Sequence, residues 1–230
     1  MNAYFDSHPG MSPLEQKAAQ YELIAEHFTP VLFRNSPFFS ETGLKISEYD
    51  GHTSLSSGGY VYCRNSHLFR DVSPAEYDHY NACGRLALHL AYGPYCDPDH
   101  HCFPFTNVLA QGLEGIYRKV IAKGESDFYS AAARGLLAVK RIAERFAEAA
   151  EAQNLPEVAK IARRIPWRPA ETFYEGLACI WFLHQIGGVL DGIGMSVIGH
   201  PDRMLASLYR NDIASKRITA EEAYDLICRF

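Results

Sequence analysis

The chain has 230 residues, of which 47% are hydrophobic, and its 27 acidic and 22 basic residues give a formal net charge of −5. This balance is typical of a globular protein and argues against a disordered chain. The basic residues form no run of five or more, so the sequence predicts neither a nucleic-acid surface nor an anionic membrane as a partner.

Four predicted helix starts share one pattern, a Ser or Thr followed three residues later by Glu, which is typical of a capping box. The first two helices are expected near residues 13–28 and 74–92, each with Pro at its first position. Between them, turn residues and a β-like run at 60–62 predict mostly irregular chain with one or two strands. The four pairs are Ser12/Glu15, Ser73/Glu76, Thr172/Glu175 and Thr219/Glu222.

Apolar residues at helical spacing predict three helices in the middle of the chain. The first covers residues 106–124 and ends at Gly124, which supplies a C-terminal stop. A long amphipathic helix covers residues 126–153 and packs along one face only. A short helix covers residues 156–164 and ends before Pro166, because a residue that precedes proline is pushed away from helical geometry.

The helix predicted from Thr172 to about Leu190 has almost no polar face, so we expect it to be buried on all sides. A helix of this kind needs more protein around it. The last predicted helix opens at Thr219 and has no terminal cap, although apolar residues continue to Phe230. No repeat or linker interrupts the chain, so a single mainly helical unit is the simplest description.

Location and redox state are inferred from features that the sequence lacks. No apolar stretch reaches the roughly 18 residues of a membrane span, and residues 1–10 lack the layout of a signal peptide. The expected location is therefore the cytoplasm. Six cysteines are too sparse for a disulfide framework, so we expect thiols, most of them small core residues.

The segment 165–225 resembles glycyl-radical enzymes of the pyruvate formate-lyase type. Residues 165–177, with the sequence IPWRPAETFYEGL, lead into the apolar helix, and further matching elements come after it in family order. The resemblance is clear over residues 108–230. These later elements are Trp181-Phe182, His184, Gly199 with Asp202, Tyr209, Asp212 and the run ITAEEA at 218–223.

This resemblance implies a fold that is mainly α with a few short strands and that forms part of the family's ten-stranded α/β barrel. Residues 1–230 would be an incomplete amino-terminal part of a pyruvate formate-lyase-like domain. The family's active-site cysteine loop and its radical glycine match nothing in this sequence. We therefore expect both to lie after Phe230, and we expect no activity from the isolated chain.

The resemblance also implies a reaction class. It implies radical cleavage of a C–C, C–O or C–N bond in a small metabolite, by a formate acetyltransferase or a dehydratase or lyase of anaerobic metabolism. A glycyl radical in the missing part would be installed by a radical SAM iron–sulfur activating enzyme, and no cofactor is expected on this chain. The implied assembly is a homo-oligomer or a pair of complementing chains.

The family's substrate-pocket positions fall on four residues of this chain, and no catalytic residue is among them. Either His100 or His101 matches a histidine that can line the substrate cavity, while Asp191 and Ser196 match positions in the turn after the apolar helix. The alternative for these histidines is an exposed loop. The alternative for the turn is a tight glycine connection between a helix and a barrel strand, with Asp202 as the cap of the next element.

Two other interpretations remain open. Cys96, His100, His101 and Cys102 combine soft ligands that a transition metal could use, but their spacing fits no common zinc pattern, so we expect no metal. The alternative to an enzyme is a non-catalytic helical fragment, or a subunit that binds a partner chain. The missing cysteine loop and radical glycine motivate this alternative.

Overall fold

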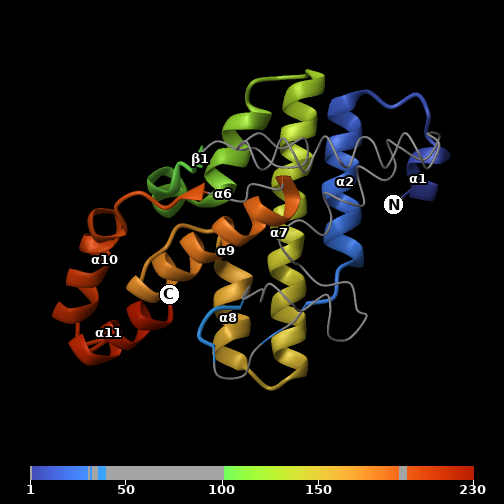
Figure 1. Cartoon of the computed structure of the whole chain (residues 1–230). Coiled ribbons are helices and arrows are strands. Elements are labelled where there is room, and N and C mark those ends of the chain that lie inside the picture. The colour runs from blue at the N-terminus through green and yellow to red at the C-terminus, as the bar shows by residue number, and fades with distance from the viewer. Residues whose placement is uncertain (1, 31, 33–35, 40–100, 192–195) are drawn as a thin grey trace, which may run out of the picture.

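The computed structural model describes residues 2–30, 32, 36–39, 101–191 and 196–230 (Figure 1). This part of the chain is mainly helical, and its two short strands pair in parallel. The predicted helix at 74–92, its cap at Ser73 and the β-like run at 60–62 lie outside the described residues. The elements are α1 (Asn2–Asp6), α2 (Pro13–His27), β1 (His101–Cys102), α6 (Phe105–Ile121), α7 (Asp127–Ala152), α8 (Pro156–Arg164), α9 (Phe173–Asp191), β2 (Ser196–Val197), α10 (Pro201–Ala214) and α11 (Ala220–Arg229).

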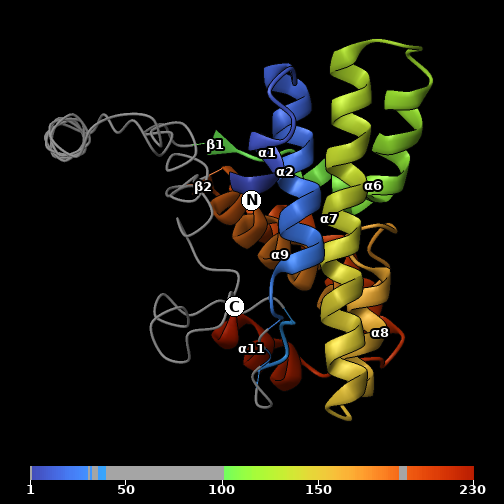
Figure 2. The same ribbon diagram turned by 90° about the vertical axis from the view of Figure 1, so that its right-hand side faces the viewer.

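Helix α7 is the long helix against which α2, α6 and α8 pack (Figure 2). Charged side chains tie α2 to α7, since Arg134 Nε donates a hydrogen bond to Glu22 Oε1 at 2.7 Å and Arg145 Nη1 donates to the carbonyl oxygen of Ala25 at 3.1 Å. Beneath them, the buried rings of Phe28 and Phe146 lie 5.5 Å apart between centroids. The predicted one-sided packing of this helix is confirmed.

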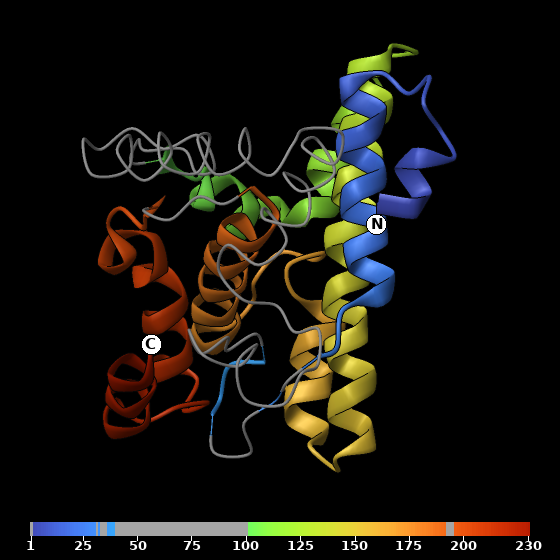
Figure 3. The same cartoon turned by 45° about the vertical axis from the view of Figure 1, so that its right-hand side comes forward.

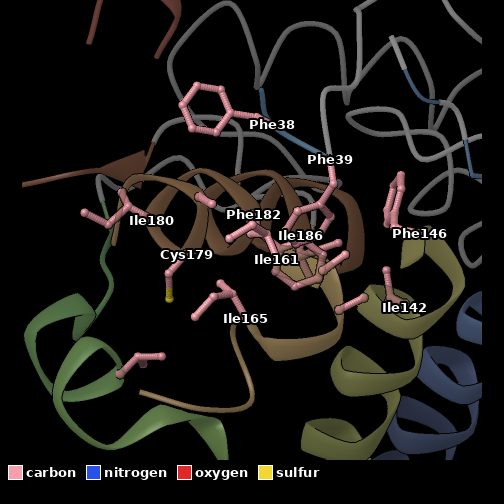
Figure 4. Packing of buried hydrophobic residues seen from close by; sticks show 14 of the residues in the cluster. Phe38, Phe39, Ile142, Phe146, Ile161, Ile165, Cys179, Ile180, Phe182 and Ile186 are labelled. Atoms are coloured by element: carbon pink, nitrogen blue, oxygen red, sulfur yellow. The ribbon is translucent and has the colours of Figure 1, made fainter. Parts of the chain in front are cut away.

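Helix α9 lies in the middle of the molecule, between the layer of α7 and α8 and the layer of α10 and α11 (Figure 3). Its side chains meet buried residues of several elements, as Figure 4 shows for Phe39, Ile161 and Ile165 around Phe182. The rings of Phe39 and Phe182 lie 5.1 Å apart. Apolar burial of this kind stabilises the fold by about 25 cal/mol for each Å² removed from water.

The predicted burial of α9 is confirmed along most of its length. The buried residues include Phe173, Leu177, Ala178, Cys179, Ile180, Phe182, Ile186 and Leu190. The protein that covers these residues belongs to this chain, and the expectation that the helix needs more protein around it stays a prediction. Trp181 and Leu183 are only half-buried.

Helix α6 differs from its prediction because it is broken at Gly112, where φ is +66° and ψ is 170°. The segment after α8 crosses the helix at this point. The amide of Leu113 donates a hydrogen bond to the carbonyl oxygen of Pro166, and the amide of Ala170 donates to that of Leu109, each at 3.0 Å. Periodicity alone does not reveal such a break, because apolar spacing continues on both sides of the glycine.

Of the three predicted capping boxes that lie within the described residues, two are confirmed as complete. Ser12 and Thr219 form complete capping boxes with Glu15 and Glu222, and Ser126 accepts a hydrogen bond from the amide of Tyr129 at 3.1 Å. At Thr172 the box is only half formed. Its hydroxyl accepts from the amide of Glu175 at 3.1 Å, but the Glu175 carboxylate accepts from the amide of Glu171 instead.

Helix α10 has no counterpart among the sequence-based predictions. Its N-cap residue is His200, which makes no side-chain cap within the described part of the chain, and Asp202 lies inside the first turn. The prediction that Asp202 caps the next element is therefore wrong. A carboxylate in the first turn still favours the helix, because it faces the positive end of the helix dipole. No helix among the described residues is long and apolar enough to cross a membrane.

Candidate functional site

The candidate site lies where the two short strands meet. Strand β1 directly precedes α6, and β2 lies between α9 and α10. The two strands lie next to each other (Figure 2). They pair in parallel, with His101 opposite Ser196 and Cys102 opposite Val197. Two of the four predicted substrate-binding residues are thus neighbours across a strand pair, although 95 positions separate them in the sequence.

Of the other two predicted residues, the structure describes the backbone of Asp191 but not His100. Asp191 is the last residue of α9, so it lies at the helix end that precedes the strand pair. His100 lies outside the described residues, and the choice between His100 and His101 stays a prediction. The backbone therefore places His101 and Ser196 side by side, with Asp191 at the end of the neighbouring helix.

One face of α9 turns toward the strand pair. The ring of Phe103, the residue after β1, lies against Gly187, with its Cε2 atom 3.0 Å from the position that a β-carbon at Gly187 would take. His184 shares this face with Gly187, because residues three positions apart lie along one side of a helix. Helix α9 thus supplies one wall of the candidate site.

His184 is a titratable residue of this face. In the sequence, His184 matches a family position to which no role was assigned. Its side chain is half-buried, and this desolvation lowers the pKa of the imidazole below its ordinary value of 6.5. Near neutral pH the neutral imidazole is therefore the favoured form.

The turn after α9 is only partly described. Gly199 has a φ of +84°, a conformation that glycine adopts without strain, and Ile198 beside it packs against the core. This geometry agrees with the interpretation of the segment as a glycine turn. His200, the next residue, is exposed.

The opposite end of α9 is held by a buried carboxylate. Asp212 of α10 is 2% exposed, and its Oδ2 atom accepts a hydrogen bond from the amide of Phe173 at 2.7 Å. Its Oδ1 atom pairs with the guanidinium of Arg217. Asp212 therefore acts as a second cap for α9, a role that sequence reasoning missed because it depends on a contact across 39 positions.

Metal binding gains no support in the described part of the chain. Among those residues, no three His, Cys, Asp or Glu side chains come together in a way that could hold a metal ion. His101 and Cys102 are consecutive residues of β1, and Cys96 and His100 lie outside the described residues. The absence of a metal site stays a prediction.

Comparison with known proteins decides the family. Residues 74–230, more than half of the chain, match the family model described as Pyruvate formate lyase-like. The chain belongs to this family of glycyl-radical enzymes.

Solved structures of the family share the fold of almost the whole chain. A Roseburia inulinivorans structure that concerns 1,2-propanediol dehydration has a TM-score of 0.72 and 19% identity, over 99% of this chain and 34% of that chain. The glycerol-bound form of the B12-independent glycerol dehydratase from Clostridium butyricum has a TM-score of 0.70 and 17% identity, over 99% of this chain and 35% of that chain. Hydroxyproline dehydratase from Clostridioides difficile, with trans-4-hydroxy-L-proline bound, has a TM-score of 0.69 and 17% identity, over 98% of this chain and 36% of that chain.

At such low identity these matches show the fold alone. The pyruvate formate lyase-like chain described here spans about a third of the length of each of these enzymes. Its helices accordingly cover only a part of the barrel that the complete enzymes contain.

Proposed function

We propose that this chain forms part of a glycyl-radical dehydratase that removes water from a small hydroxylated metabolite. The observation that carries the proposal is the agreement in fold, over 98–99% of the chain, with enzymes whose descriptions concern 1,2-propanediol, glycerol and hydroxyproline. A small diol, a triol or a hydroxylated amino acid is the substrate class that these relatives favour. Formate acetyltransferase activity receives no such support from them.

The strand pair provides the polar groups for such a substrate. His101 and Ser196 are neighbours across β1 and β2, and Asp191 ends the helix beside them. Imidazole, hydroxyl and carboxylate groups all form hydrogen bonds with alcohols, so this part of the chain can bind and orient hydroxyl groups. Precise orientation contributes strongly to catalysis, since even a small misplacement of the substrate slows the reaction.

The radical chemistry itself would come from elsewhere in the enzyme. A glycyl radical, installed by a radical SAM iron–sulfur activating enzyme, would supply the hydrogen abstraction that starts the reaction. The described residues would bind substrate and exclude water around it, which is the usual contribution of the protein in radical enzymes. We also place the cysteine loop outside this chain, as the resemblance implies.

The test uses the complete gene product that contains this chain, expressed without oxygen together with its activating enzyme. We expect an electron paramagnetic resonance doublet from a glycyl radical, and formation of an aldehyde from 1,2-propanediol or glycerol or of a dehydrated product from trans-4-hydroxy-L-proline. Formation of formate from pyruvate and coenzyme A alone would instead refute the dehydratase proposal. Activation without any turnover of these substrates would also count against it.

Substitutions in the strand pair test its role in substrate binding. Ser196→Ala should raise KM about two- to tenfold, because the net loss of one hydrogen bond is about 0.5–1.5 kcal/mol. His101→Ala should raise it at least as much. Ser130→Ala, at an exposed position of α7, and His27→Ala, at the exposed end of α2, are the matched controls and should leave KM unchanged.

One observation favours the alternative of a subunit that binds a partner chain. An apolar groove of about 530 Å³ lies between α9, α10 and α11, and Ile227 at its edge is 53% exposed. If this alternative holds, the 230-residue chain should co-purify with a separate chain that carries the rest of the domain. Ile227→Glu should then abolish co-purification without lowering the melting temperature.

A further inference from the structure

Phe103 joins the candidate site to two helices. Its carbonyl oxygen accepts a hydrogen bond from the amide of Phe105 at 2.8 Å, and the two rings lie 5.6 Å apart. Phe105 is 1% exposed and begins α6. The backbone of Phe103 is therefore held at the start of α6, while its side chain reaches α9.

The ring of Phe103 fits against α9 because residue 187 has no side chain. A β-carbon at Gly187 would collide with the Cζ atom of Phe103 and would lie 3.0 Å from Cε2 and 3.3 Å from Cε1. All three atoms belong to the far end of the ring. The depth to which this ring enters the surface of α9 therefore depends on Gly187.

The ring that packs on Gly187 belongs to the residue directly after β1. Phe103 directly succeeds Cys102, and Cys102 pairs with Val197 of β2. A collision at the ring that displaces the backbone of Phe103, rather than rotating the ring about its Cα–Cβ bond, would move β1 as well, because one peptide bond joins Phe103 to Cys102. A close-packed contact of this kind transmits small displacements.

We infer that Phe103 and Gly187 are positioning residues: the contact between the ring and the helix sets the position of the strand pair, and thereby the position of His101 and Ser196 relative to the substrate. The second half of this statement rests on the proposed function, whereas the first half concerns the strand pair alone. Neither residue is expected to touch substrate. Their effect on catalysis passes through the strand pair, where a shift of about 1 Å can lower activity by up to about 100-fold.

Gly187→Ala is the first test, and Gly176→Ala is its matched control. Both variants add one methyl group to α9, and the new β-carbon at Gly176 would lie 2.5 Å from Cδ2 of Leu205, on the side of α10 and away from the strands. Both should lower the melting temperature, because overpacking a tight contact is destabilising. Only Gly187→Ala should disturb the strand pair.

Hydrogen exchange measures that disturbance directly, in the complete gene product. We expect amide exchange at residues 101–103 and 196–198 to become about tenfold faster in Gly187→Ala and to stay unchanged in Gly176→Ala. The double variant Phe103→Leu with Gly187→Ala removes the three colliding ring atoms, so it should restore slow exchange. Unchanged exchange in Gly187→Ala, or no recovery in the double variant, would overturn the inference.

Activity provides the second readout. Gly187→Ala should lower kcat/KM at least about tenfold with most of the change in KM, the double variant should recover it, and Gly176→Ala should match the wild type. If the wild type does not turn over any hydroxylated substrate, the proposed function fails, and the exchange measurement still decides whether the contact positions β1. Equal losses of kcat/KM in both glycine variants would show a merely structural effect and refute the positioning role.

Discussion

The backbone carbonyl of Trp167 occupies the space in which Gly112 would carry a β-carbon. This carbonyl accepts a hydrogen bond from the amide of Glu114 at 3.0 Å, and the neighbouring Cα atom of Arg168 would lie 2.9 Å from the same β-carbon. The break in α6 therefore allows close packing: the segment between α8 and α9 crosses the helix with its backbone in direct contact with the backbone of α6. The indole of Trp167 also packs on Tyr117, with ring centroids 5.7 Å apart.

Gly112→Ala should destabilise the chain by about 2–5 kcal/mol. The left-handed φ of +66° costs an alanine about 1–2 kcal/mol, and the collision with rigid backbone adds about 1–3 kcal/mol. Gly124→Ala is the matched control, because its φ is +86° but no heavy atom of the described residues would lie within 4 Å of the new β-carbon. Gly124→Ala should lower the free energy of unfolding by only about 1–2 kcal/mol. Equal losses in guanidinium unfolding would contradict the packing argument.

Thr172→Ala should lower the free energy of unfolding by about 1 kcal/mol, as is usual for the loss of an N-cap. The Thr172 hydroxyl accepts from the amide of Glu175, and that amide would have to find water instead. Thermal or urea unfolding measures the change. An unchanged melting midpoint would show that this cap does not contribute to stability.

Asp212→Ala should lower the free energy of unfolding by about 2–3 kcal/mol, which is more than the loss expected for Thr172→Ala. It leaves the buried amide of Phe173 without its acceptor and removes the partner of Arg217, whose side chain is 55% exposed and can be solvated by water. Asp202→Ala is the control on the same helix, since that carboxylate is 77% exposed, and it should change stability by about 0.5 kcal/mol at most. Similar losses for both aspartates would contradict a capping role for Asp212.

Local signals explain how much of the fold the sequence could predict. The boxes at Ser12 and Thr219 form within one helical turn, so their residues suffice to locate a helix start. The break at Gly112 and the cap from Asp212 depend on contacts with segments that lie far away along the chain, so the periodicity of apolar residues cannot predict either feature. Helix α10 was missed because its N-cap residue, His200, is not one of the usual capping residues.

The candidate site shows the same division. The resemblance indicated either His100 or His101, and separately Ser196, as site candidates. The adjacency of His101 and Ser196 requires strand pairing between segments that α6 to α9 separate along the chain. Phe103 and Gly187 gave only a weak signal, a glycine inside an apolar helix, which often indicates close packing by another element. Which side chain packs against that glycine depends on tertiary structure.

The two cysteines whose side chains the structure describes should differ strongly in reactivity. Cys179 is 1% exposed, and burial, with a smaller contribution from Glu175, raises the pKa of its thiol to about 12. Cys228 is exposed. Because the thiolate is the reactive form, iodoacetamide at pH 8 should modify Cys228 at least about 100-fold faster in the folded chain. Mass spectrometry of the peptides measures both rates, which should become similar in guanidinium; equal rates without denaturant would contradict the burial of Cys179.

His184 should make the folded state sensitive to mild acid. Burial lowers the pKa of His184 below 6.5, so the unfolded chain binds a proton more readily than the folded one. The free energy of unfolding therefore rises with pH. The loss of stability caused by His184 is absent above about pH 6.5, grows as the pH falls, and becomes constant below the pKa of His184 in the folded state.

The substitution His184→Gln removes this titration and should flatten the pH dependence of the free energy of unfolding between about pH 7.5 and 5. Other groups titrate in the same range, so the informative quantity is the difference between wild type and variant in urea unfolding at each pH. A profile for His184→Gln that stays parallel to that of the wild type would show that the folded environment does not disfavour the charged form of His184.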